Sequence, residues 1–133
     1  MEIIKARTVI PGQAEGRALV VNDRVGFLGF IDYRRGLFTG AQTQVAGATF
    51  KDTVLIFRSG KAATGGARSI DLAVRSGNSP AAIVNLELDP VTVAGCAMNC
   101  IPMLQLYDDS AFSIVKTGDW VSIDEGMLIL HQV

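Results

Sequence analysis

The residues best suited to chemistry lie in one short stretch, where an apolar run ending at Phe57 leads into the Gly-rich segment 59–66, Ser-Gly-Lys-Ala-Ala-Thr-Gly-Gly. Small residues let a backbone approach a ligand closely. A helix is predicted to begin directly after them, and its unpaired N–H groups would point into the loop and favour an anion. Lys61 adds a positive charge. A carboxylate or a phosphate therefore suits this place.

The same stretch has a second interpretation. It differs from the phosphate-binding P-loop, G-x-x-x-x-G-K-(S/T), in which the lysine stands at the far end. A tight strand-to-helix turn would also use small residues, only to avoid clashes. The local pattern leaves both an anion site and a plain turn open.

The remaining candidates are weaker. Asp32 ends a Gly-containing loop and is either a ligand contact or a turn aspartate. Cys96 and Cys100 stand one helical turn apart, but two thiols without further ligands do not complete a zinc or iron–sulfur site. We expect both to be small buried side chains. His131 is the only histidine, so no nucleophile–base triad can be assembled, and the chain does not look like an enzyme that works alone.

Strand patterns dominate the elements that must position these residues. Helical spacing follows the Gly-rich segment and recurs after Asp89-Pro90, an N-cap followed by proline at the first helical position. Residues 25–49 are expected to be irregular. This order predicts one β-rich α/β domain over 1–133, with helices on one face. The expected strands are 2–10, 17–21, 54–57, 81–86, 101–106, 120–123 and 127–131, and the expected helices are 67–75, 90–99 and 108–115.

Composition excludes several classes of function. The 133 residues hold 12 Lys or Arg against 13 Asp or Glu, without the basic excess of a nucleic-acid binder. No apolar run approaches the ~20 residues that span a bilayer. The first residues lack the pattern of a signal peptide. We therefore expect a cytoplasmic protein with neither nucleic acid nor membrane as partner.

Taken in order, several short motifs resemble the small subunit, or fused swivel domain, of the aconitase X family. Each motif is weak alone, but their order and separations match over nearly the whole chain. Residues 11–20 resemble "G-x-A-x-G-x-A-L-V", residues 27–32 resemble "S-F-(W/L)-G-G-(V/L)-D-P", and residues 54–66 resemble "V-L-V-F-P-x-G-(K/R)-G-S-(S/T)-x-G-S". Residues 79–84 resemble "A-P-A-A-I-(V/I)", residues 94–102 resemble "x-G-A-(I/L)-x-A-x-I-P", and residues 116–119 match "K-T-G-D".

The resemblance implies a swivelling β/β/α domain that closes over a large subunit. The family includes dehydratases of cis-3-hydroxyproline and of 5-phosphomevalonate, and both remove water from a small hydroxy acid. The large subunit would supply iron or an iron–sulfur cluster as Lewis acid. The small subunit would supply the Gly-rich loop, whose serine acts as base or contacts the substrate. The implied substrate-binding residues here are Gly60, Lys61, Ala62, Ala63, Gly65, Gly66, Phe27, Gly29 and Asp32.

This chain departs from the family pattern at the residues expected to react. Ala63 replaces the loop serine, Ala62 the preceding glycine and Ala67 the last serine, while Gly26 replaces the serine before Phe27. A methyl group cannot move a proton, so Thr64 is the hypothesis for a substitute hydroxyl.

Three functions remain open: a working dehydratase subunit, a non-catalytic subunit that binds and gates its partner, and a standalone anion-binding domain. A phosphohistidine carrier is excluded because the loop holds no histidine.

Overall fold

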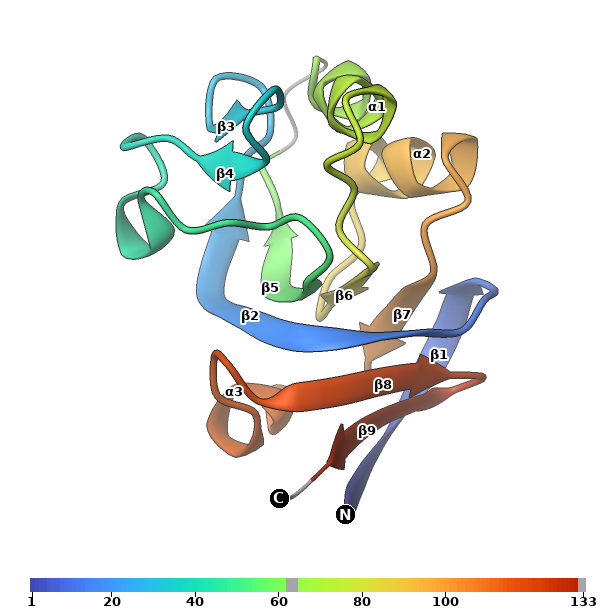
Figure 1. Cartoon of the computed structure of the whole chain (residues 1–133). Helices are drawn as coiled ribbons and strands as arrows, with labels where there is room; N and C mark the ends of the chain where they lie inside the picture. The colour runs from blue at the N-terminus through green and yellow to red at the C-terminus, as the bar shows by residue number, and fades with distance from the viewer. Residues whose placement is uncertain (62–64, 132–133) are drawn as a thin grey trace.

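A closed barrel of seven strands forms the body of the computed structural model, which describes residues 1–61 and 65–131. The strands follow one another around the barrel in the order β1-β7-β6-β5-β2-β8-β9 (Figure 1). Their bounds are Glu2–Ile10 (β1), Ala14–Val25 (β2), Val54–Gly60 (β5), Ala82–Asn85 (β6), Met103–Leu106 (β7), Trp120–Asp124 (β8) and Met127–His131 (β9).

Two long strands close the barrel because each pairs in two sheets. The start of β1 pairs with β9 and its end with β7, both antiparallel. The start of β2 runs antiparallel to β8, and from Ala18 onward β2 runs parallel to β5. β5, β6 and β7 continue in parallel. β2, β5, β6 and β7 therefore form a parallel set, and β2 and β5 both end at the upper side of the molecule in Figure 1.

Helices α1 (Gly66–Arg75) and α2 (Pro90–Met98) connect the parallel strands and lie together on one face, as the sequence predicts. Alternate side chains of the strands, such as Leu55, Phe57 and Ile83, form one core cluster with α1 and α2. The opposite side chains, including Ile56 and Val84, form a second cluster, against which the short α3 (Ala111–Ile114) packs. This alternation follows from the two-residue period of a strand.

The stretch expected to be irregular holds small elements of its own. A two-stranded sheet pairs β3 (Ile31–Asp32) with β4 (Leu37–Phe38), and the 3-10 helix η1 spans Thr43–Val45. β2 runs longer than expected because its first residues pair with β8. Among the residues described, no helix has the length and apolar character needed to cross a membrane.

Candidate functional site

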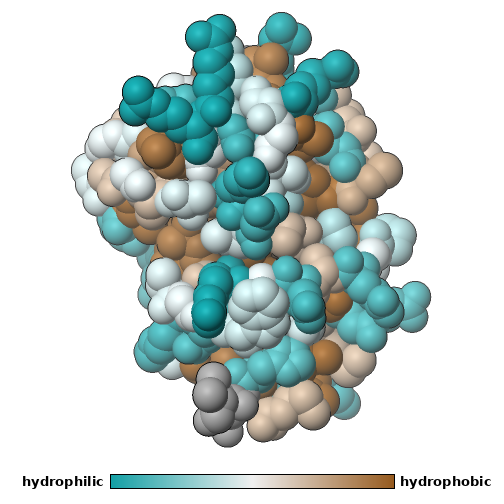
Figure 2. Space-filling view, in the orientation of Figure 1, coloured by the Kyte–Doolittle hydropathy of each residue, from teal (hydrophilic) through white to brown (hydrophobic). Residues whose placement is uncertain are grey.

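The candidate site lies where β2 and β5 end side by side. Val25 is the register partner of Gly60, and Lys61 N donates a 3.1 Å hydrogen bond to Val25 O. The chain leaves β2 into the segment 26–30 and leaves β5 into the Gly-rich segment. Ligands of α/β sheets bind at this carboxyl edge of parallel strands. Figure 2 shows hydrophilic side chains projecting from this upper rim of the molecule.

Asp89 fixes the end of β5. Its Oδ2 accepts a hydrogen bond from Gly60 N at 3.0 Å, and its Oδ1 accepts bonds from Val91 N and Thr92 N at 3.1 and 3.0 Å. The carboxylate thus caps α2, as the sequence predicts, and also ties that cap to the Gly-rich segment. A Cβ at position 60 would overlap Asp89 Oδ2 and lie 2.5 Å from Thr92 Oγ1. Only glycine allows this close approach.

The segment 26–30, called the covering loop below, packs on both ends of the Gly-rich segment. The Phe27 ring packs edge-on against Phe57, with ring centroids 6.0 Å apart. Leu28 lies against Gly65, where a Cβ would come within 2.7 Å of its Cδ2. The covering loop therefore lies against Phe57 near the end of β5 and against Gly65 before α1.

Phe30 connects the covering loop to Lys61. Lys61 Nζ lies 4.3 Å from the Phe30 ring centroid, a cation–π distance. The same ring lies directly on Gly26, where any Cβ would overlap it. Gly26 N donates to Gln42 Oε1 at 3.2 Å, and Gln42 Nε2 donates to Arg24 O at 3.1 Å. This buried glutamine holds the end of β2 and the base of the loop in place.

The backbone N–H groups at the start of α1 are potential hydrogen-bond donors to a ligand. Gly65 precedes the helix, and no side-chain hydrogen bond from a described residue caps it. The N–H groups of a first helical turn have no partner within the helix and favour an anion. The Gly-rich segment thus contains a lysine after the end of β5 and leads into a first helical turn that no described side chain caps, which is compatible with the anion interpretation of the sequence.

Asp32 ends β3 and binds the backbone of the turn that follows it. Its Oδ1 accepts hydrogen bonds from Arg34 N and Arg35 N, both at 3.1 Å, and its Oδ2 lies 3.6 Å from Arg35 Nε. The amide of Asn78 donates to Tyr33 O and Arg34 O at 2.9 and 3.0 Å, which anchors the turn to the end of α1. The turn interpretation of Asp32 thus has a direct structural basis, and a ligand contact stays a prediction.

The structure brings most of the predicted site residues together: Phe27 and Gly29 in the covering loop, and Gly60, Lys61, Gly65 and Gly66 around the Gly-rich segment. Asp32 lies beyond the covering loop. The predictions for Ala62, Ala63 and Thr64 concern residues outside those that the structure describes.

Three residues of the site were not predicted from the sequence: Phe30, Gln42 and Asp89. Asp89 was expected only as a helix cap. The sequence did hold a signal for Phe30. Gly26 and Phe30 both depart from the family motif, and they stand only four positions apart.

The cysteines do not form a metal site. Cys96 is buried, and burial together with the nearby Asp89 charge raises the pKa of its thiol to about 12. Cys100 is exposed, so the expectation that both are buried is wrong. Cys100 follows α2 in a left-handed conformation, with φ of 53°, which turns it out of the helix face that Cys96 occupies. Within the described ranges, no group of three His, Cys, Asp or Glu could hold a metal ion.

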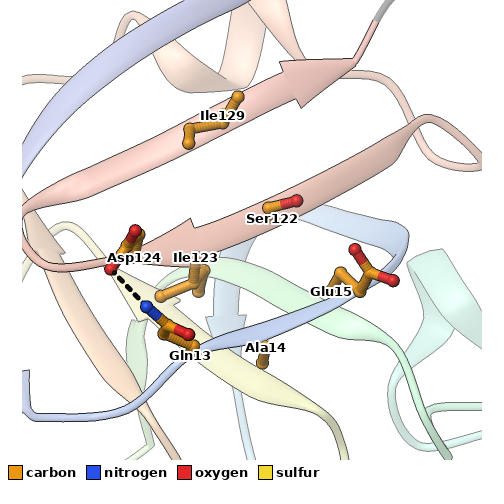
Figure 3. Close-up of a pocket in the computed structure, with 7 residues that line it drawn as sticks. All are labelled: Gln13, Ala14, Glu15, Ser122, Ile123, Asp124 and Ile129. Carbon is orange, nitrogen blue, oxygen red and sulfur yellow. Dashed lines mark hydrogen bonds between the residues drawn. The ribbon is translucent and has the colours of Figure 1, made fainter.

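A hollow of about 430 Å³ lies away from the Gly-rich segment, on β2, β8 and β9 (Figure 3). Gln13 Nε2 donates to Asp124 Oδ1 at 3.1 Å across one end. Glu15 and Asp124 line this hollow together with five uncharged residues. A hollow lined by two carboxylates and no cation does not suit the anion for which the Gly-rich segment is suited.

Comparisons with known proteins agree with this geometry. The family model described as the aconitase X swivel domain matches residues 3–131. The chain is 33% identical over 121 residues to the phosphomevalonate dehydratase small subunit of Methanosarcina acetivorans, covering 91% of this chain and 84% of the relative. The corresponding subunit of Archaeoglobus fulgidus is 34% identical over 126 residues, covering 93% and 95% of the two chains.

Solved structures share the fold. The crystal structure of Thermococcus kodakaraensis aconitase X, in its holo-form, superposes with a TM-score of 0.91 at 28% identity, covering 99% of this chain and 100% of that one. A protein solved by solution NMR gives 0.89 at 32% identity, covering 98% and 100%. The order of motifs, the barrel with its two helices on one face, and these matches lead to the same conclusion: the chain belongs to the aconitase X swivel-domain family.

Proposed function

We propose that this chain is the small subunit of a hydro-lyase that removes water from a phosphorylated hydroxy acid of the phosphomevalonate type. Its partner in this proposal is an aconitase X large subunit. The names of the relatives support both the reaction class and the existence of a partner. A cis-3-hydroxyproline-like substrate is the alternative within the same reaction class.

One observation of the structure carries the proposal: the Gly-rich segment brings Lys61, at the end of β5, and the start of α1, which no described side chain caps, to the place where the parallel strands β2 and β5 end. Both favour an anion, and a phosphorylated hydroxy acid carries two anionic groups. The apolar side chains of Phe27 and Leu28 lie above, where they would exclude water once a partner closes over the site.

The chemistry that breaks the C–O bond is assigned to the partner. The described residues of this chain do not fit iron or an iron–sulfur cluster, since Cys96 is buried with a raised pKa and stands without further ligands. The proposed cluster therefore belongs to the large subunit, and this chain binds and orients the substrate. Thr64 remains the proposed hydroxyl in place of the family serine at Ala63.

Reconstitution tests the proposal. The chain is mixed without oxygen with an aconitase X large subunit from the same cell, and loss of water from 5-phosphomevalonate and from cis-3-hydroxyproline is followed by NMR. We expect turnover of 5-phosphomevalonate only when both subunits are present, and loss of turnover in Thr64→Ala. A complex that binds 5-phosphomevalonate without dehydrating it would favour the gating subunit, and the absence of any complex would contradict the proposal.

A further inference from the structure

The Lys61 side chain is held by an aromatic ring in place of a carboxylate. Its Nζ lies 4.3 Å from the Phe30 ring centroid, on the quadrupole face that attracts cations. Among the residues the structure describes, no carboxylate oxygen lies within ion-pair distance of Lys61, and the two ion pairs present join Arg35 to Asp32 and Arg75 to Asp71. The ammonium therefore keeps its charge available for an incoming anion.

Contacts with Gly26 fix the position of the Phe30 ring. The ring rests on Gly26, where even a single methyl group would overlap it. Gly26 is held by the buried Gln42, which accepts from Gly26 N and donates to Arg24 O. Phe30 N donates to Phe27 O at 3.2 Å within the covering loop, and Phe30 O accepts from Thr39 N at 2.9 Å. Gln42, Gly26 and Phe30 thus form a rigid base for an otherwise flexible lysine.

Charge is distributed unevenly along the chain. Residues 24–75, which contain the covering loop, the turn after Asp32 and α1, carry eight Lys or Arg against three Asp or Glu. Residues 76–133 carry one Lys against seven Asp or Glu. An uneven distribution of this kind draws anions toward the basic part of the surface.

We propose that Phe30 is a positioning residue that holds the Lys61 ammonium ready for an anionic group of the substrate. A free lysine would lose the freedom of four rotatable bonds on binding, whereas a lysine already held on a ring loses less. The ring thus contributes to affinity without touching the reacting atoms. This inference rests on the proposed function, and it adds a residue that sets substrate affinity.

Kinetics of the assembled two-subunit complex give the first test. Phe30→Leu should raise KM about 2- to 5-fold, the range of an exposed cation–π contact, and leave kcat unchanged. Phe30→Tyr keeps a ring and should restore the KM of the original protein. In a Lys61→Met background, Phe30→Leu should change KM no further. A fall in kcat, or an equal KM effect with and without Lys61, would overturn the inference.

Phe112→Leu is the matched control, because Phe112 also faces a cation, Arg58, at 5.6 Å. Phe112 lies in α3, at the lower side of the molecule in Figure 1 and away from the covering loop. The same substitution there should leave KM unchanged. A KM increase equal to that of Phe30→Leu would mean that lost packing, and not the position of Lys61, causes the effect.

Competitive inhibition identifies the anionic group. Inorganic phosphate and acetate are added separately as inhibitors of the complex. If Lys61 binds a phosphate, Phe30→Leu weakens inhibition by phosphate, and if it binds a carboxylate, the variant weakens inhibition by acetate. Unchanged inhibition by both anions would overturn the role of Phe30 in anion binding.

A second test uses NMR and does not depend on enzymatic turnover. In the full 133-residue chain, the ring current of Phe30 should shift the Lys61 ε-methylene NMR signal upfield, and Phe30→Leu should abolish the shift while Phe30→Tyr keeps it. The same signal in all three proteins would contradict the contact. Absence of turnover in the complex would count against the proposed function alone, because the NMR measurement still decides whether Phe30 holds Lys61.

Discussion

Gly60→Ala tests whether the Asp89 carboxylate fixes the Gly-rich segment at the end of β5. The added Cβ would overlap Asp89 Oδ2 and lie 2.5 Å from Thr92 Oγ1, so the carboxylate must move. Its movement strains the bond from Gly60 N and the two bonds that cap α2. Overpacking costs about 1–3 kcal/mol, and a lost N-cap adds about 1 kcal/mol. We expect the free energy of unfolding to fall by about 2–4 kcal/mol.

Thermal unfolding followed by circular dichroism measures this loss. For a chain of this size, each kcal/mol lowers Tm by roughly 3–5 °C, so Tm should fall by about 6–20 °C. Gly40→Ala is the matched control, because no atom lies within 4 Å of a Cβ at that position, and its effect should stay within about 1 kcal/mol. Equal Tm values for the two variants would refute the account of Gly60 and Asp89.

Three further predictions concern stability. Cys100 has a left-handed φ of 53°, so Cys100→Gly should raise the free energy of unfolding by about 1 kcal/mol, and an unchanged urea midpoint would contradict the strain. The pKa of the Cys96 thiol is raised from 9.0 to about 12. Between these values the unfolded chain loses a proton that the folded chain keeps, so stability falls as pH rises, and Cys96→Ala should lessen that slope. Identical slopes in both proteins would show that the thiol does not contribute. Asn78→Ala removes two hydrogen bonds to the turn at Tyr33 and Arg34 and should cost about 1–3 kcal/mol in urea unfolding; a loss near zero would mean that the turn holds without them.

Local signals in the sequence were enough to predict much of the fold. Asp89 followed by Pro90 marks the start of α2, and the structure places the N-cap there. The strands expected at 120–123 and 127–131 are β8 and β9, which pair across the turn Asp124-Glu125-Gly126. These signals work because a cap or a tight turn depends on a few consecutive residues.

Longer-range features could not be predicted in the same way. β2 was expected over 17–21 but runs from Ala14 to Val25, because pairing with β8 and β5 extends it at both ends. The bond between Gly60 and Asp89 joins residues 29 positions apart, and Gln42 bonds to Gly26 across 16 positions. Contacts of this kind follow from how the strands are arranged and leave no periodic pattern in the sequence.

The candidate site likewise has one part that local sequence patterns indicate and one part that only the structure shows. The Gly-rich segment and Lys61 were selected from residue type, because small residues before a helix and a nearby cation suit an anion, although the same pattern left a plain turn open. The role of Phe30 depends on the absence of a side chain at Gly26. That coupling is visible only once the covering loop is folded over the end of β5.

The most direct test of the account is a pull-down of the tagged chain from its native cell extract, with iron analysis of the material that co-purifies. We expect a stoichiometric larger subunit of the aconitase X family that carries iron. Recovery of the chain alone, free of iron and of uniform size, would contradict its assignment as a dehydratase subunit and would favour a standalone anion-binding domain.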